Sequence, residues 1–295
     1  MQVDHKEPNI AAFHLAGIIP VAGQKLDYNF PWHDSLMPLA PNYLAIEHAV
    51  LECANAGCET IWIVCHNDMQ PLIRHRLGDW VQDAAVFERG SREWRTQQNQ
   101  REIPLFYVPI HPKDRGRRDC LGWSVLYGTI TAYHINRKLS KWVIPDKYFI
   151  SFPYGITPLD IIRKNRKLIS AKKNFCLTYR GQNVKNNKYL SFTYDGPDFQ
   201  RCRRNLRQQQ THERDENHKR LPLHERWDAR WFPLDKVFEP VDFEEANTLE
   251  TPWYYGIDNW EGYCEFLSSE ERKEFEKPEY MKYREWNPIG EDNET

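Results

Sequence analysis

The sequence predicts an α/β protein in which helices cover both faces of a mostly parallel sheet. Three observations support this fold class. Strand-like and helix-like segments alternate along the first half of the chain, which is the order that right-handed βαβ crossovers require. The segment 60–65 (TIWIVC) is rich in β-branched and apolar residues, as expected of a strand buried in a parallel sheet. The 295 residues are 40% hydrophobic, and a chain of this length can bury a large core.

Residues that typically start or stop secondary structure mark the ends of the first strand and the first helix. Residues 14–21 form a short apolar run that stops near Pro20, which is typical of a strand. Asn42 is a good helix cap, and apolar side chains then recur at helical spacing until Gly57. We therefore expect a helix over 42–57, which leads into the strand at 60–65.

The remaining elements of the first half follow the same alternation. Asn67 or Asp68 can cap a helix that has Pro71 in its first turn and runs to about residue 82. The polar, aperiodic residues 88–102 predict an exposed loop. A strand at 105–109, a helix at 121–139 and a strand at 148–152 complete this half.

The second half has a less regular pattern. Two strands at 175–179 and 189–194 are joined by residues 181–188 (GQNVKNNK), which have the composition of a hairpin loop. Residues 200–220 are rich in Gln and Arg and predict an exposed helix or a mobile insertion. A strand at 253–257 and a helix starting at 259 close the predicted domain.

The formal net charge of −2 conceals two opposed blocks. Residues 163–230 contain 18 basic and 7 acidic side chains, whereas residues 239–295 contain 5 basic and 17 acidic ones. We expect one domain over 1–267 with a basic insertion at 196–230, followed by an acidic extension at 268–295. Pairing of the two blocks, within a chain or in a homo-oligomer, explains both at once. Nucleic-acid binding by 201–220 is a less favoured alternative.

Several classes of protein are excluded by simple absences. No apolar run approaches the roughly 20 residues that span a bilayer, and residues 1–9 lack a signal-peptide core, so no membrane partner is expected. The seven cysteines form no C-x-x-C pair, which indicates reduced thiols in a cytoplasmic protein and argues against structural zinc. Neither a G-x-S-x-G elbow nor a Walker loop occurs.

Five short motifs follow the order found in one enzyme family. The sequence reads GIIPVAGQKL at 17–26, HDSLMPL at 33–39, AGCETIWIV at 56–64, LGWS at 121–124 and YGIDNWEGY at 255–263. In order and spacing these segments resemble the sugar-phosphate nucleotidyltransferases over residues 12–160 and, more weakly, over 250–267. The resemblance implies a GT-A-like α/β sandwich that binds a nucleotide or a sugar phosphate.

The resemblance also implies which residues take part in the chemistry. In this family a glycine-rich loop lets backbone N–H groups approach phosphates, and a basic residue at its end stabilises their charge. Lys25 falls at that basic position, and Asp258 matches the second of two aspartates that bind Mg²⁺. The resemblance thus implies catalytic roles for Lys25 and Asp258, with Asp258 as the Mg²⁺ ligand. It further implies substrate contacts by Gly17, Gly23 and Gln24.

Further candidates come from a loop in the predicted fold. The loop before the helix at 121–139 lies near the carboxyl ends of the strands, where α/β proteins bind ligands. Its basic side chains predict an anion site, and the turn at the helix start, which resembles the family's L-G-T-A segment, implies a contact with the base. These residues are His111, Lys113, Arg115, Arg117, Arg118, Leu121 and Gly122.

The sequence departs from the family pattern at three places. Only Gly23 remains of the glycine cluster, Asp34 stands where the family has a phosphate-binding lysine, and the strand-end aspartate falls on Pro153 or Tyr154. A lone carboxylate at Asp258 would bind Mg²⁺ weakly. A second carboxylate beside Asp258 in the folded chain would complete a two-ligand site.

Two functions are compatible with these patterns. The first is a divergent nucleotidyltransferase that forms an NDP-sugar and pyrophosphate from an NTP and a sugar 1-phosphate, assisted by Mg²⁺. The second is a binding or structural protein that keeps the fold without the chemistry. In the second case Lys25 is a solvated loop residue, and Asp258 caps the helix that starts at Asn259.

Overall fold

The computed structural model describes residues 13–25, 27–83, 102–115, 118–138, 144–208, 216–222, 225, 231–273 and 275–278. The strands in these ranges are β1 (Leu15–Pro20), β2 (Pro38–Ala40), β3 (Tyr43–Leu44), β4 (Thr60–Cys65), β5 (Trp80–Gln82), β6 (Glu102–Pro109), β7 (Lys147–Ile150), β8 (Gly155–Ile156), β9 (Phe175–Thr178), β10 (Phe192–Asp195), β11 (Asn247–Glu250) and β12 (Tyr255–Gly256).

The helices in the same ranges are mostly short. They are α1 (Ala45–Ala56), α2 (Gln70–Leu77), α4 (Pro112–Arg115), α5 (Leu121–Lys138), α6 (Leu159–Lys164), α7 (Arg166–Ile169), α8 (Gly196–Gln208), α10 (Leu234–Phe238), α11 (Trp260–Ser268) and α12 (Glu270–Lys273), with 3-10 turns η1 (Asp34–Leu36) and η4 (Val184–Asn186). No helix among the described residues is long and apolar enough to cross a membrane.

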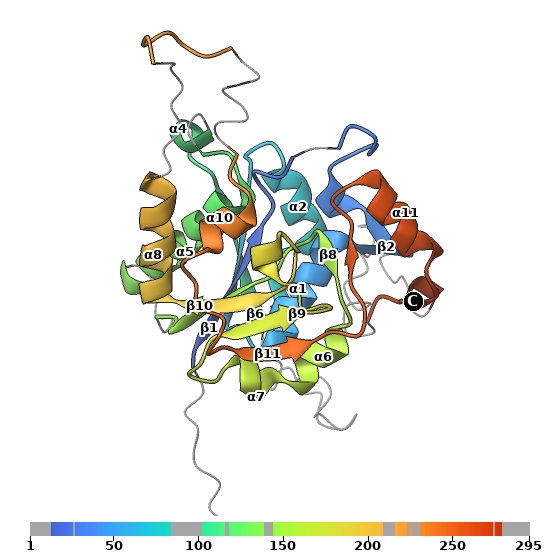
Figure 1. Ribbon diagram of the computed structural model, residues 1–295. Helices are drawn as coiled ribbons and strands as arrows, with labels where there is room; N and C mark the ends of the chain where they lie inside the picture. Colours follow the sequence, from blue (N-terminus) through green and yellow to red (C-terminus); the bar gives the residue numbers. More distant parts are fainter. Residues whose placement is uncertain are drawn as a thin grey trace, which may run out of the picture.

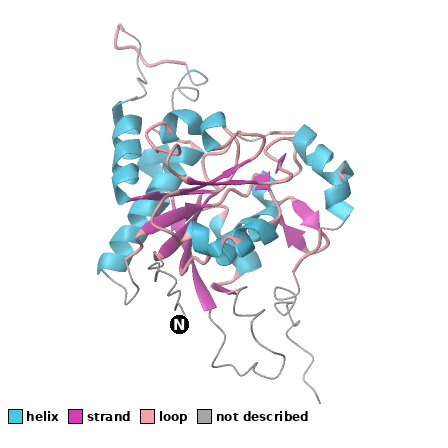
Figure 2. Ribbon diagram, turned by 60° about the horizontal axis from the view of Figure 1, so that its bottom comes forward, coloured by secondary structure: helices cyan, strands magenta, loops and turns pink. Residues whose placement is uncertain are grey.

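A central sheet organises the molecule. Eight described strands pair in the order β11-β9-β10-β7-β1-β4-β6-β5 (Figure 1). Strands β7, β1, β4 and β6 are parallel, so their carboxyl ends meet at one edge, which we call the carboxyl edge. Strand β10 runs antiparallel to β7 and β9, and β5 runs antiparallel to β6. Figure 2 shows helices on both sides of the strands, which confirms the α/β fold with a mostly parallel sheet.

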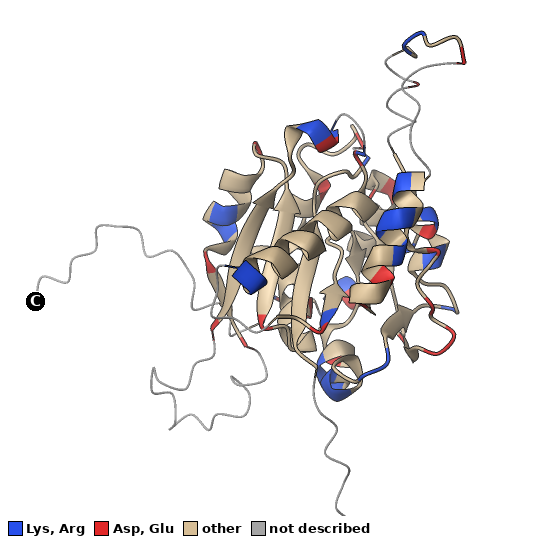
Figure 3. Ribbon diagram, turned by 90° about the vertical axis from the view of Figure 1, so that its left-hand side faces the viewer, with Lys and Arg blue, Asp and Glu red and all other residues tan. Residues whose placement is uncertain are grey.

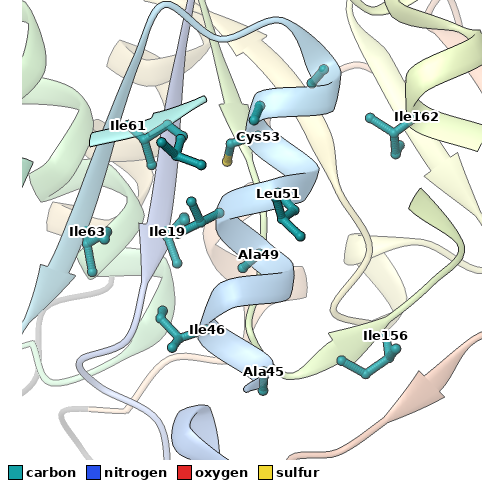
Figure 4. Packing of buried hydrophobic residues seen from close by; sticks show 14 of the residues in the cluster. Ile19, Ala45, Ile46, Ala49, Leu51, Cys53, Ile61, Ile63, Ile156 and Ile162 are labelled. Carbon is teal, nitrogen blue, oxygen red and sulfur yellow. The ribbon is translucent and has the colours of Figure 1, made fainter. Parts of the chain in front are cut away.

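The two faces of the sheet are covered by different helices. Helices α1, α6 and α7 contribute to the apolar cluster on one face, and α5, α8 and α10 contribute to the cluster on the other. On the first face Ile46, Ala49 and Cys53 of α1 lie against Ile19 and Ile61 of the sheet (Figure 4). All six residues of β1 and all six of β4 are buried. This burial is why both segments are so apolar, and it confirms the strand predicted at 60–65.

The first helix starts later than its expected cap. Asn42 adopts a left-handed backbone with φ of 56° in the turn between β2 and β3, and α1 begins at Ala45. The side chain of Glu47 closes the helix start instead, because its Oε2 accepts a hydrogen bond of 2.8 Å from the Leu44 N–H. Asparagine suits this turn conformation as well as it suits a cap, so the local pattern predicted the wrong role.

Other boundaries also differ from the expected ones. Helix α2 ends at Leu77, because Gly78 follows with φ of 74° and the chain turns back as β5 along β6. The predicted strand at 189–194 shortens to β10. Residues 84–101 lie outside the described residues, so the predicted loop at 88–102 is tested only at Glu102, which begins β6.

The basic and acidic segments pack in part on the domain. Helix α8 has one buried face that includes Cys202 and Leu206, and Arg201 pairs with Asp198 on the same helix. Beyond α12, the ring of Phe275 stacks on Tyr43 at a centroid distance of 5.7 Å. Figure 3 shows basic and acidic positions interspersed over the helices. The predicted pairing of residues 201–220 with the acidic end stays a prediction, since Arg201 pairs within its own helix and residues 209–215 and 279–295 lie outside the described residues.

Candidate functional site

The loop after β1 packs tightly on the start of α5. The N–H groups of Val21 and Ala22 both donate to the carbonyl of Val64, at 2.8 and 3.0 Å. Gly23 follows with φ of 85°, and the backbone of Cys120 occupies the space that a Cβ at this position would take. Only glycine fits here, since the turn is left-handed and the two backbones touch. The glycine that remains of the family's cluster therefore fixes the path of the loop.

Asp258 lies at the carboxyl edge, between β12 and α11. Its Oδ2 accepts a hydrogen bond of 3.2 Å from the Tyr189 hydroxyl, which in turn accepts one of 3.3 Å from the side-chain amide of Gln24. The helix cap is its neighbour Asn259, whose Oδ1 accepts from the Gly262 N–H at 2.8 Å. Asp258 is therefore available for a role other than capping.

A second carboxylate lies within electrostatic range of Asp258. Burial raises the pKa of Asp258 above its ordinary value, and the negative charge of Asp34 raises it further, while Lys188 opposes the shift. Asp34 and Asp258 are far apart in the sequence, and the fold brings their charges within range of each other. The sequence analysis did not include Asp34 among the site residues. The signal that could have identified it was the acidic residue at a position where the family has a phosphate-binding lysine.

The carboxylate of Asp34 is only half satisfied. Asp34 is 1% exposed, and its Oδ1 accepts from the Ser35 N–H at 2.9 Å and lies 3.0 Å from Nδ1 of His33. Its Oδ2 is buried and has no hydrogen-bond partner among the described residues. Leaving a carboxylate oxygen buried without a partner is costly, so this atom marks a place where a ligand or cation would be favourable.

Tyr154 is, with Pro153, one of the two positions on which the resemblance places the strand-end aspartate. The side chain is fully buried, and its hydroxyl donates to the carbonyl of Val21 at 2.8 Å. Burial, with the nearby charges of Asp34 and Asp258, raises the pKa of Tyr154 well above its ordinary value, so the phenol stays neutral. A neutral hydroxyl that holds the first loop is a structural link and not a metal ligand of the ordinary kind.

The other predicted residues of the first loop and of the α5 start divide into two groups. Lys25 is exposed, and its Nζ lies 4.3 Å from the ring centroid of Trp231, at the mouth of the loop. Gly17 and Gly122 have packing explanations, because a Cβ would lie 2.8 Å from Cys53 Sγ and 2.7 Å from Val237 Cγ2 respectively. The side chain of Leu121 is buried in the core. Substrate contacts by these residues stay predictions.

The side chains of the basic loop at 111–118 differ in their exposure to solvent. His111 and Lys113 are exposed, whereas Arg115 turns buried nitrogen atoms toward the molecule. The guanidinium of Arg118 stacks over Trp123 at 4.7 Å from the ring centroid. Arg117 lies outside the described residues. Among the described residues of this loop, Arg115 directs buried guanidinium nitrogens toward the interior. The anion site predicted for this loop stays a prediction.

The donor set is compatible with Mg²⁺ shared with a phosphate. Among the described residues no group of three or more His, Cys, Asp or Glu side chains is arranged to hold a metal ion. Mg²⁺, however, is usually held by one or two carboxylates together with water and substrate phosphates. Asp34 and Asp258 provide two carboxylates, and Asp34 Oδ2 is the unpartnered oxygen that such an ion needs.

Comparison with known proteins identifies the fold. No family model and no curated protein matches the sequence. Among solved structures, a Bacillus anthracis protein described as a glucose-1-phosphate thymidylyltransferase, solved with sucrose, is 11% identical with a TM-score of 0.56 and covers 91% of this chain and 99% of its own. An apo UDP-glucose pyrophosphorylase (12% identical, TM-score 0.48, covering 89% and 100%) and a Vibrio cholerae nucleoside-diphosphate-sugar pyrophosphorylase (11%, 0.47, covering 86% and 100%) are also similar.

The likeness to the first of these structures extends over nearly the whole of both chains. It establishes that this protein has the fold of the sugar-phosphate nucleotidyltransferases, as the order of its motifs predicted.

Proposed function

We propose that this protein binds a nucleotide or a sugar phosphate at the carboxyl edge, through a divalent cation shared with Asp34 and Asp258. The observation that carries the proposal is Asp34 Oδ2, which is buried and lacks a partner among the described residues, and the charge of Asp34 acts on Asp258. The charge of Asp34 disfavours ionisation of Asp258, and a bound cation would offset this repulsion. The family resemblance supports the choice of a phosphate-bearing ligand.

Each residue has a definite part in this arrangement. Tyr189 holds one oxygen of Asp258, and Ser35 holds one oxygen of Asp34, so each carboxylate is oriented. Gly23 lets the first loop pack against the start of α5, and Lys25 in this loop would contact a phosphate. A bound Mg²⁺ would neutralise phosphate charge, and so assist attack on an NTP by a sugar 1-phosphate.

The binding proposal is tested by thermal shift and calorimetry with NTPs, NDP-sugars and sugar phosphates, with and without Mg²⁺. We expect Mg²⁺-dependent stabilisation of the wild type by at least one of these ligands and its loss in Asp34→Asn and Asp258→Asn. Asp160→Asn is the matched control, because Asp160 pairs with Arg163 on the surface of α6. If no nucleotide or sugar phosphate changes the melting temperature of the wild type, with or without Mg²⁺, the proposal is wrong.

The reaction proposed for the site is formation of an NDP-sugar and pyrophosphate from an NTP and a sugar 1-phosphate. Release of pyrophosphate that requires Mg²⁺ and falls sharply in Lys25→Ala would support it. A second candidate is binding without transfer, which is favoured by Pro153 or Tyr154 in place of the strand-end aspartate and by the loss of the family's lysine at Asp34. Ligand binding without pyrophosphate release from any NTP and sugar phosphate pair would select the second candidate.

A further inference from the structure

Arg115, at the end of α4, carries an unused hydrogen-bonding edge. Its Nε and Nη2 atoms are buried and have no hydrogen-bond partner among the described residues. These two nitrogens form the side-on edge of the guanidinium, from which two N–H bonds point in parallel. Such an edge matches two oxygens of one phosphate or carboxylate. The exposed His111 and Lys113 on the same loop lack this feature.

His66, directly after β4, is the neighbour of this edge. Its Nδ1 is also buried without a partner among the residues that the structure describes, and its Nε2 lies 3.8 Å from Asp119 Oδ1. Burial and the positive charge of Arg115 lower the pKa of His66, with His33 acting the same way and Asp119 and Asp68 opposing. The Ile110 N–H donates to the carbonyl of Cys65 at 3.2 Å, and Asp119 lies 3.8 Å from His66, so both ends of the loop that carries Arg115 lie against the end of β4.

The surroundings indicate what this ligand is. Asp119 lies near Nε2 of His66, at 3.8 Å, while Nδ1 of His66 and the Nε–Nη2 edge of Arg115 have no hydrogen-bond partner among the described residues. Three buried nitrogen atoms that need partners fit a group with three oxygens, and a phosphoryl group has them whereas a carboxylate has two. Nδ1 of His66 can donate to such an oxygen in the tautomer that carries the proton there, or as imidazolium.

We propose that the Nε–Nη2 edge of Arg115 and Nδ1 of His66 form a subsite that binds a phosphoryl group directly, without a divalent cation. The subsite deepens the proposed function, on which it rests for the identity of the ligand as a phosphorylated nucleotide or sugar. His33 connects the two places, since it contacts Asp34 at 3.0 Å and lies within electrostatic range of His66. The ligand thus meets the cation at one end of the site and the arginine fork at the other.

The subsite is tested with inorganic phosphate as the probe, in EDTA, by calorimetry on the full chain. We expect wild-type binding that weakens at least tenfold in Arg115→Met and in His66→Phe. Arg115→Lys should also weaken binding, because lysine keeps the positive charge but lacks the two parallel N–H donors of the Nε–Nη2 edge. Lys138→Met, a change of the same charge at the exposed end of α5, should bind phosphate like the wild type. Equal affinity of Arg115→Met and the wild type would overturn the proposal.

A structural role for Arg115 makes the opposite prediction for the ligand-free protein. Because the fork lacks a partner, Arg115→Met should melt at the same temperature as the wild type or higher when phosphate is absent. A large drop in melting temperature would show that Arg115 holds the fold, and would overturn the subsite. Asp258→Asn separates the two proposals. This variant should keep phosphate binding in EDTA while it loses Mg²⁺-dependent nucleotide binding. A wild type that binds phosphate but binds no nucleotide or sugar phosphate with Mg²⁺ would leave the subsite standing and remove the proposed function.

Discussion

Glu52 gives a prediction that tests how the core of this protein is built. It lies on α1, is 4% exposed, and its Oε2 accepts a hydrogen bond from the Ser151 hydroxyl at the end of β7. Burial raises its pKa from 4.5 to about 7, while that hydrogen bond acts in the opposite direction. Replacing Glu52 with glutamine keeps the size of the side chain and removes its ability to ionise.

The size and sign of the effect follow from linkage. Between pH 4.5 and about 7 the folded protein holds the Glu52 proton that the unfolded chain has released. The free energy of unfolding of the wild type therefore falls as pH rises through this window. A rise of about 2.5 pH units in pKa corresponds to about 3 kcal/mol. Glu52→Gln escapes this loss, so it should be more stable than the wild type by up to about 3 kcal/mol at pH 8.

The assay is urea unfolding at pH 5, 6, 7 and 8, with the wild type subtracted from the variant at each pH so that other titrating groups cancel. Glu270→Gln is the control, because Glu270 is exposed and pairs with Lys273. A stability difference between Glu52→Gln and the wild type that stays constant from pH 5 to pH 8 would refute the reasoning.

Three further predictions concern the first loop and the strand before it. Gly23→Ala should lower the free energy of unfolding by more than about 1 kcal/mol in urea titrations and abolish nucleotide binding, because a Cβ meets backbone at a φ of 85°; unchanged binding would contradict this. Tyr154→Phe removes the hydrogen bond to the Val21 carbonyl, so it should lower the free energy of unfolding by about 1–3 kcal/mol and weaken nucleotide affinity. A variant as stable as the wild type would show that this hydrogen bond is dispensable. Gly17→Ala crowds Cys53, so it should lower the free energy of unfolding by about 1–3 kcal/mol, while the folded variant keeps its affinity for the nucleotide. If calorimetry shows that the fully folded variant has lost this affinity, a substrate contact by Gly17 is favoured instead.

The sequence predicts the elements of this fold best where local signals agree with burial. The strand at 60–65 and the helix from Leu121 were predictable because each has an unambiguous apolar pattern and both lie in the core. Asn42 was misassigned because the same residue type suits a cap and a left-handed turn, and only the pairing of β2 with β3 decides between them.

The site was predicted only in part, because its key contacts join distant segments. The match of Asp258 to a family motif was visible, but its interaction with the charge of Asp34 depends on the tertiary fold, which brings two distant segments together. The same limit applies to Arg115, whose neighbours in the sequence are equally basic. The burial of its Nε and Nη2 atoms, and its electrostatic interaction with His66, depend on tertiary packing and cannot be derived from sequence spacing.

The central claim is that Asp34 and Asp258 together hold a divalent cation with a phosphate-bearing ligand. Electron paramagnetic resonance of Mn²⁺, which replaces Mg²⁺ at oxygen sites, tests this directly on the wild type and on Asp34→Asn, Asp258→Asn and Asp160→Asn. We predict bound Mn²⁺ in the presence of a nucleotide or sugar phosphate for the wild type and Asp160→Asn, and free Mn²⁺ for the other two variants. Mn²⁺ that stays bound in Asp34→Asn and Asp258→Asn, or that never binds the wild type, would contradict the claim.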